Sequence, residues 1–328
     1  MKFDTGQKII QIVKQKGEVR PDELIRELGV SRVAVHRQLK KLVASGALRR
    51  LGRPPRVFYA IGVEFIKSAA IDSPETEKFI NKNYLYVSPL GEMVSGAKGF
   101  WRWLAAIGKT KEAEVFARRF QKIRQAANQQ MGKNGLIDLT AKLKNTYKVV
   151  YLEQVFCRDF YSLPEFGKTH LGQLVLYAKQ SQSQKLIGKL AQESKPLINN
   201  LIRHKKISAA AFVPHSLPRQ LQFLEEFAKN VSLNLPEINL VKVRSGEVIV
   251  AQKSLSKLSE RVMNARETIV VENIGKLYPA VLLIDDAVGS GATLNETAKK
   301  LKAKRIAKKV YGFALVGSFK GFDVIREF

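Results

Sequence analysis

The segment 280–301, AVLLIDDAVGSGATLNETAKKL, limits what this chain can fold into more than any other stretch. Its apolar run 281–284 is the pattern of a strand that is buried on both faces. Two acids, Asp285 and Asp286, follow directly, and a loop of small residues over 289–293 then leads into a segment of helical character. Strands buried on both faces occur in parallel sheets covered by helices, so we expect an α/β fold for this part of the chain.

The loop after this strand has the composition of a phosphate and sugar site. Backbone N–H groups and the amino end of a helix attract a phosphate dianion, and the Ser290 and Thr293 hydroxyls add donors. The acid pair suits two vicinal ribose hydroxyls, which makes Asp285 and Asp286 the candidate catalytic residues. The alternative is an ordinary strand-to-helix turn with the acids as caps. The candidate phosphate-binding residues are Ala287, Val288, Gly289, Ser290, Gly291, Ala292 and Thr293.

Two common nucleotide motifs do not describe this loop, because the Gly-Lys-Ser/Thr ending of a Walker loop is missing and G-x-G-x-x-G is incomplete. Over 281–293 the segment instead resembles the phosphoribosyl pyrophosphate motif of type I phosphoribosyltransferases. VPHSLPRQLQF (213–223) and AQKSLSKLSERVMNA (251–265) are similar to segments of the ComF-like members of that family. The resemblance covers about residues 170–328, and its matching positions in the second segment are Gln252, Leu255, Ser256, Arg261 and Asn264.

This resemblance implies a fold, a ligand and further site residues. The C-terminal part would be a type I phosphoribosyltransferase-like parallel sheet flanked by helices, binding phosphoribosyl pyrophosphate together with Mg²⁺. By analogy, Arg219, Lys253 and Arg261 would meet pyrophosphate oxygens, the last two from a hood that closes over the substrate. Three departures matter: Gly289 stands where many members have threonine, the Arg-Gly-Phe-Asn-Gln box is reduced to QLQFLE, and the cysteine-rich zinc element is absent.

The N-terminal segment has a separate helical pattern. Apolar residues at helical spacing predict a first helix over 5–15, which Gly17 ends, and a second helix that starts at Pro21 and ends at Gly29. Ser31 is a good N-cap for a third helix over 32–44. The third helix has one apolar face and one cationic face.

Two short strands, over 48–51 and 56–61, follow these helices and are joined by a basic turn, GRPP. Three helices and a basic hairpin form a winged helix-turn-helix, and the segment resembles the winged domains of bacterial and archaeal transcription regulators through GVSRVAVHRQLKKLVASGAL and RRLGRPPRVFYAIG. The resemblance implies that the third helix enters the DNA major groove. A protein-interaction role is the alternative. The candidate DNA-binding residues are Ser31, Arg32, Arg37, Lys41, Arg53 and Arg56.

The middle segment carries no chemical motif. We expect a linker helix or an extended connection over 63–80, and a hairpin over 83–96. Amphipathic helices over 110–130 and 135–147 are expected to connect domains or to form a homodimer contact. Trp101 and Trp103 favour a packing role over stacking on a ligand.

Charge and composition limit the classes of partner that we expect the chain to bind. The 328 residues include 56 Lys and Arg against 29 Asp and Glu, a formal charge of +27, which predicts attraction to nucleic acid or phosphorylated ligands. The single cysteine, Cys157, excludes an internal disulfide and a thiolate zinc site, so we predict no metal bound by protein ligands alone. Because no apolar run is long enough for a bilayer, we expect a cytoplasmic protein with no membrane partner.

The sequence thus predicts an α/β protein with a winged helix-turn-helix domain over 1–62, a linker and mixed segment over 63–150, and a phosphoribosyltransferase-like domain over 151–328. Three functions stay open. The first is a ligand-responsive DNA-binding regulator, similar in architecture to the purine-operon repressors. The second is an active nucleobase or amine phosphoribosyltransferase, and the third is a DNA-handling protein like the ComF group.

Overall fold

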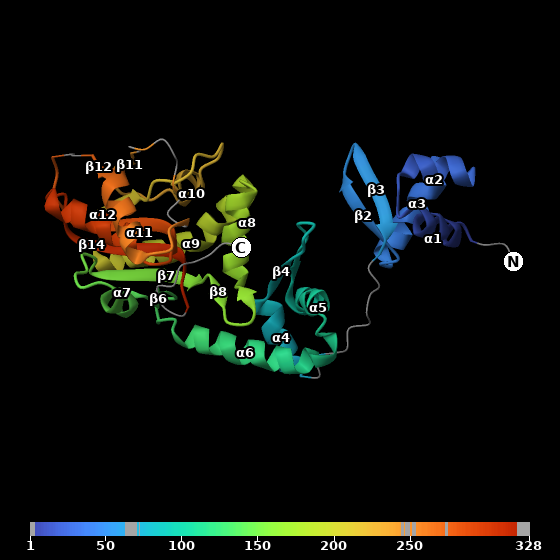
Figure 1. The fold of residues 1–328 in the computed structure, drawn as a ribbon, viewed down its shortest axis with the longest axis horizontal. Helices are drawn as coiled ribbons and strands as arrows, with labels where there is room; N and C mark the ends of the chain where they lie inside the picture. The colour runs from blue at the N-terminus through green and yellow to red at the C-terminus, as the bar shows by residue number, and fades with distance from the viewer. Residues whose placement is uncertain are drawn as a thin grey trace. The chain divides into compact units, whose positions relative to one another are not determined.

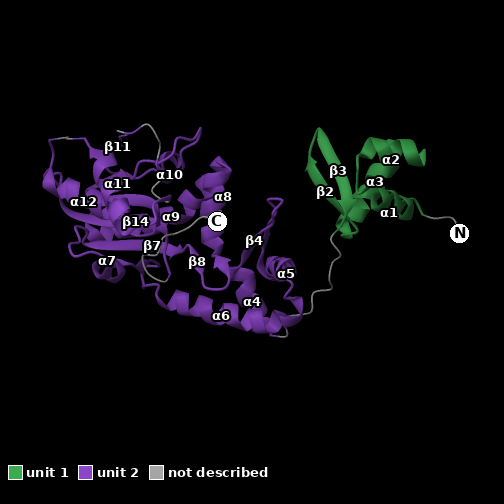
Figure 2. Cartoon of the chain, in the orientation of Figure 1, with its two compact units in different colours: residues 1–70 green, residues 71–328 purple. Residues whose placement is uncertain are grey.

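The computed structural model describes residues 4–62, 71, 73–243, 246, 250, 254–272 and 275–319 (Figure 1). The chain divides into two compact units, Met1–Ala70 (unit 1) and Ile71–Phe328 (unit 2), shown in Figure 2. From residue 71 on, the middle segment therefore folds as part of the same unit as the C-terminal segment.

The described residues of unit 1, 4–62, form three helices and an antiparallel sheet of order β1-β3-β2. The helices form because apolar residues at helical spacing, such as Ile9, Val13, Val35 and Leu39, are buried together in one small core. The three predicted helices and the two wing strands are confirmed, and β1 is an addition too short to show a sequence pattern. The elements are α1 (Thr5–Lys16), β1 (Glu18–Val19), α2 (Pro21–Leu28), α3 (Arg32–Ala44), β2 (Leu48–Arg53) and β3 (Arg56–Ile61).

The main sheet of unit 2 has the strand order β10-β13-β14-β7-β6. Four strands run parallel, and only the short edge strand β6 is antiparallel to its neighbour. Ile284 pairs with Phe212 on one side and with Phe313 on the other, so the segment around the acid pair lies in the interior of the sheet. The strands are β6 (Ile137–Asp138), β7 (Gln154–Phe160), β10 (Ala209–Phe212), β13 (Tyr278–Val288) and β14 (Ala307–Gly317).

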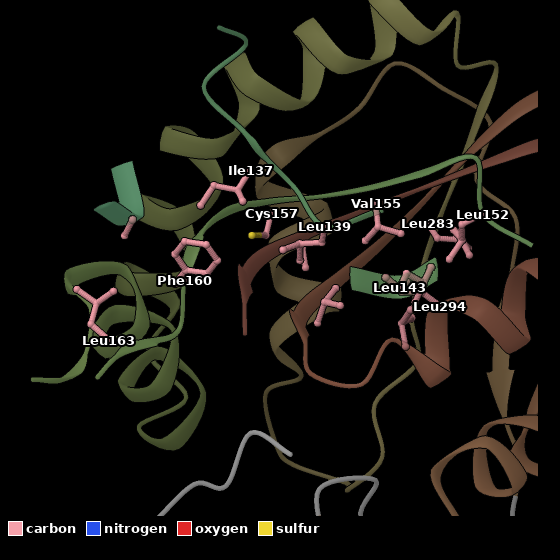
Figure 3. Packing of buried hydrophobic residues seen from close by; sticks show 14 of the residues in the cluster. Ile137, Leu139, Leu143, Leu152, Val155, Cys157, Phe160, Leu163, Leu283 and Leu294 are labelled. Atoms are coloured by element: carbon pink, nitrogen blue, oxygen red, sulfur yellow. The ribbon is translucent and has the colours of Figure 1, made fainter. Parts of the chain in front are cut away.

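Helices cover both faces of this sheet, as the unbroken apolar run in β13 predicts. Leu283 packs in a cluster that includes Leu143 of α7 and Leu294 of α12, part of which Figure 3 shows. Leu282 and Ile284 pack in a second cluster with α8, α9 and α10. The predicted mixed α/β architecture is confirmed at this level. The helices are α7 (Thr140–Thr146), α8 (His170–Gln180), α9 (Gln184–Lys205), α10 (Phe223–Val231), α11 (Leu258–Thr268) and α12 (Ala292–Ala303).

The part of unit 2 before the sheet is held by aromatic packing. The hairpin predicted over 83–96 is confirmed, with β4 and β5 paired in antiparallel register. Tyr84 packs edge-on against Phe100 with ring centres 5.0 Å apart, and Trp103 lies against both rings, which confirms its packing role. The elements here are α4 (Pro74–Asn83), β4 (Leu85–Val87), β5 (Met93–Ser95), α5 (Gly96–Ala106), the 3-10 turn η1 (Thr110–Glu112) and α6 (Ala113–Gln129).

One predicted helix is wrong in its first half. Instead of a helix over 135–147, the chain forms β6 and then α7. Ile137 pairs with Cys157 of β7, so residues 137 and 138 form a strand. The Asp138 carboxylate accepts the Thr140 N–H at 2.8 Å, and the helix begins at Thr140. Pairing with the sheet edge, a long-range effect, decides this local structure.

Four further short strands pair in antiparallel hairpins or ribbons: β8 (Ser162–Leu163) with β9 (Gly167–Lys168), and β11 (Leu240–Lys242) with β12 (Ile269–Val271).

Candidate functional site

A pocket lies in unit 2 at the carboxyl ends of β10 and β13. This is the edge at which open parallel sheets bind ligands, because the loops that follow the strands converge there. The loop after β13, the segment after β10, the end of α8 and the helix α11 all contribute walls. The described lining residues are Tyr161, Val175, Lys179, 213–217, Arg219, 222–224, Lys242, Arg261, Ile269, 285–291, Thr293 and Leu294.

Both candidate acids reach this pocket and are partly exposed in it. Side chains alternate along a strand, so Asp286 lies on the face of Leu282 and Ile284, the face that α8 covers, and Asp285 lies on the other. The Asp286 backbone N–H donates to Asp285 Oδ1 at 2.7 Å and fixes the first carboxylate against the chain. The two acids are the only carboxylates among the described lining residues.

The two acids have different electrostatic surroundings. Burial raises the pKa of Asp285 well above its ordinary value of 3.8, and the neighbouring Asp286 charge raises it further, while Lys179 acts in the opposite direction. Asp286 instead forms an ion pair with the Lys179 ammonium of α8. The two acids therefore differ in their nearest influence: burial acts most strongly on Asp285, whereas an ammonium group contacts Asp286.

Lys179 is a pocket residue that sequence reasoning missed. It stands 107 positions before Asp286, and only the packing of α8 on the sheet brings the two together. Arg219, a predicted pyrophosphate contact, lines the same pocket, and its guanidinium donates to the Lys179 backbone oxygen. An amphipathic lysine near a helix end has no local pattern that marks it as a site residue.

The loop after β13 is shaped for close approach of a ligand. Gly291 takes a left-handed conformation, with φ of 78°, directly before α12, where it is the N-cap residue and has no side chain to cap the helix. The Ser290 hydroxyl accepts the Ala292 N–H at 3.4 Å. Of the seven predicted phosphate-binding residues, six line the pocket, and the exception is Ala292, which is buried under the loop.

A segment before β7 supports this loop from behind. The Tyr147 hydroxyl donates to the Ser290 backbone oxygen at 3.0 Å, and burial raises the pKa of Tyr147 to about 12. The Asn295 side chain on α12 accepts the Tyr151 N–H at 2.8 Å and donates to the Val149 oxygen at 3.1 Å. The loop and the first turn of α12 are therefore fixed by partners from a distant part of the sequence.

Of the two residues predicted to lie in the hood, the structure describes Arg261 but not Lys253. Arg261 on α11 lines the pocket, and its Nε donates to the Leu255 oxygen at 2.9 Å. Burial lowers the pKa of Arg261. Lys253, the third predicted pyrophosphate contact, lies outside the described residues.

In unit 1 the predicted DNA-binding side chains are all exposed. The Ser31 hydroxyl accepts the Ala34 N–H at 3.3 Å and caps α3. Arg32 forms an ion pair with Asp22 of α2 at 3.0 Å, so part of its charge is used within the unit. Arg53 and Arg56 pair across the wing hairpin, and Arg37 and Lys41 stand one turn apart on α3.

Two features of this surface were not among the predicted contacts. Val33, on the first turn of α3, is 76% exposed, which is unusual for a large apolar side chain beside cationic residues. Arg49 and Arg50 of β2 add two exposed cations to the wing.

The fold and the surface of unit 1 define a winged helix-turn-helix unit. A family model described as an HTH domain matches residues 6–51, which contain α2, α3 and all of α1 except its first residue. This match indicates a DNA-binding regulator. Curated proteins include no match to the chain. In the part of the chain that the structure describes, no helix is long and apolar enough to span a membrane.

Proposed function

We propose that this protein is a transcriptional regulator that binds duplex DNA through unit 1 and phosphoribosyl pyrophosphate, or a related phosphorylated ribose, in the pocket of unit 2. One observation carries the ligand assignment. Asp285 and Asp286 lie near the carboxyl end of the central strand β13 and line the same pocket as the glycine-containing segment 287–291. The acids proposed for the sugar and the N–H groups proposed for the phosphate thus line one opening.

The pocket offers a partner for each part of such a ligand. The carboxyl groups of Asp285 and Asp286 are the partners for ribose hydroxyls, which donate hydrogen bonds to carboxylate oxygens. The N–H groups of the loop and the amino end of α12, with the Ser290 and Thr293 hydroxyls, suit the 5′-phosphate. Arg219 and Arg261 are the cations for a diphosphate.

Magnesium, which the family resemblance implies, fits the acids of this pocket poorly. Mg²⁺ prefers ionised carboxylate oxygens in a near-octahedral shell. Here Lys179 contacts the Asp286 carboxylate, and the pKa of Asp285 is raised. Among the described residues, no group of three or more His, Cys, Asp and Glu side chains forms a metal site. No part of the proposed binding therefore uses a metal ion held by these acids.

Titration calorimetry with the full chain tests the ligand assignment. Phosphoribosyl pyrophosphate should bind the wild-type protein, and the double variant Asp285→Asn/Asp286→Asn should lose the binding. Glu237→Gln, an exposed acid of unit 2 outside the pocket, is the matched control and should bind normally. Equal affinity in the wild type and the double variant would remove the site assignment.

An active phosphoribosyltransferase is the second candidate, favoured by Arg261, whose buried side chain lines the pocket where a leaving diphosphate needs a cation. In that reaction the bond between the anomeric carbon and pyrophosphate breaks, and a nucleobase or amine takes the ribosyl group. Pyrophosphate release is measured against a nucleobase panel, with and without duplex DNA. Turnover selects the enzyme, whereas a ligand-shifted DNA affinity without turnover selects the regulator.

A further inference from the structure

The last turn of α8 places an ammonium group in the pocket. Lys179 contacts the Asp286 carboxylate, and the two side chains are only 17% and 15% exposed. The ammonium also lies 6.0 Å from the centre of the Phe223 ring, which forms another wall. Removing two charged groups from water costs free energy, which the contact between them offsets. Loss of either partner would leave the other charge buried without a counter-charge.

Two contacts fix the end of α8 in this position. The Arg219 guanidinium donates to the Lys179 backbone oxygen, one of the carbonyls that a helix end leaves without an intrahelical partner. Just after the helix, Gln182 accepts the Leu221 N–H at 2.8 Å. The segment after β10, which lines another part of the pocket, therefore also fixes the position of the Lys179 backbone.

The Lys179 ammonium gives the Asp286 carboxylate a counter-charge without an added ion. Two adjacent carboxylates in a partly buried site repel each other unless one takes a proton or a cation lies nearby. The ion pair with Lys179 provides the second solution, and burial together with the Asp286 charge raises the pKa of Asp285. A divalent cation at Asp286 would have to displace a positive charge that already contacts this carboxylate.

We propose that Lys179 is a positioning residue that holds the Asp286 carboxylate ionised and oriented for the ribose hydroxyls, in place of a divalent cation. This inference rests on the proposed function, because it concerns the same pocket. It makes binding of a ribose phosphate independent of Mg²⁺. It also distinguishes Lys179 from Arg219, which holds the backbone of the same helix end.

Ribose 5-phosphate is the probe for the first test, because it lacks the diphosphate that chelates Mg²⁺. Its affinity for the full chain is measured by calorimetry in EDTA and in saturating Mg²⁺. The wild-type affinities should agree within about threefold. Lys179→Met should lose about tenfold or more in EDTA, with part of the loss restored by Mg²⁺, and Lys179→Arg should retain most of the affinity. A merely structural role of Lys179 would not create a Mg²⁺ dependence. Wild-type binding that requires Mg²⁺ would overturn the proposal.

A second measurement needs no sugar and separates this inference from the proposed function. Mn²⁺ is titrated into the ligand-free chain and followed by electron paramagnetic resonance. The wild type should show no saturable site in the pocket, and Lys179→Met should gain a site that Asp286→Asn removes. Saturable binding by the wild type that Asp286→Asn abolishes would overturn the role of Lys179. If no ribose phosphate binds under either condition, the proposed function fails, and the Mn²⁺ result alone decides the inference.

Discussion

The Arg124 guanidinium on α6 donates through one nitrogen to both carboxylate oxygens of Asp159 in β7, at 2.8 and 3.0 Å. Both side chains are nearly buried, and Asp159 also accepts the Phe160 N–H at 2.7 Å. The pair joins a helix of the middle segment to the main sheet. It gives one physical reason why the chain from residue 71 on folds as a single unit.

Removal of Arg124 should destabilise unit 2. Arg124→Leu leaves the Asp159 carboxylate buried without its cation, a change that typically costs about 3–5 kcal/mol. The free energy of unfolding from urea titration measures this loss. Arg118→Leu, an exposed position on the same helix, should change it by less than about 1 kcal/mol. A loss as small for Arg124 as for Arg118 would show that the buried pair is not important for stability.

Asp285 should make the stability of unit 2 depend on pH. Its pKa is raised in the folded chain above the ordinary value of 3.8, so the folded state binds this proton more tightly than the unfolded state does. The contribution to stability is then fully present below the unfolded pKa and is lost as the pH rises through the folded pKa. Asp285→Asn should therefore unfold at higher urea than the wild type at neutral pH, with a difference that shrinks as the pH falls toward about 4. An Asn variant that is less stable at neutral pH would contradict this.

Arg37 should contribute to sequence-specific DNA binding, because it projects from the exposed face of α3. Arg37→Ala should weaken binding to a selected duplex and relax its sequence preference by about 1–3 kcal/mol for a lost bidentate contact. Fluorescence anisotropy against the selected duplex and scrambled duplexes measures both effects. Arg203→Ala, an exposed arginine of unit 2, is the control. An unaltered footprint would place recognition in the wing or elsewhere.

Val33 should read thymine. An exposed apolar side chain on the first turn of a major-groove helix can contact the thymine C5-methyl group. Val33→Ala should therefore lose about 1 kcal/mol of binding to the selected duplex. Replacement of the contacted thymine by deoxyuridine, which lacks the methyl group, should weaken the wild type but not the variant. Equal sensitivity of both proteins to deoxyuridine would exclude this contact.

Local patterns in the sequence predict the parts of the fold that local forces determine. The helices of unit 1 follow from apolar spacing and from the Ser31 cap, and the buried strand follows from the apolar run in β13. The helix expected over 135–147 was wrong because pairing of Ile137 with Cys157 on the sheet edge outweighs the amphipathic pattern. Pairing of this kind depends on residues far away in the chain, which a local pattern does not contain.

The residues of the candidate site also fall into two groups: those that a local motif predicts and those that only the packing of distant elements brings to the pocket. Residues 285–291 and Thr293 lie within one nine-residue stretch of the sequence, about the length of a single motif, so one motif predicts nearly a whole wall of the pocket. Lys179, Tyr147 and Asn295 contribute through the packing of α8 and α12 and through the segment before β7. Nothing near these residues in the sequence marks them, because their roles depend on which elements the sheet brings together.

The proposed regulator requires that a ligand in the pocket changes DNA binding by unit 1. The direct measurement is the DNA affinity of the full chain with and without phosphoribosyl pyrophosphate, for the wild type and for Asp285→Asn/Asp286→Asn. The wild-type affinity should shift by about fivefold or more, and the affinity of the double variant should stay constant. A wild-type protein that binds the ligand in calorimetry but holds DNA with the same affinity in its presence would contradict ligand-responsive regulation.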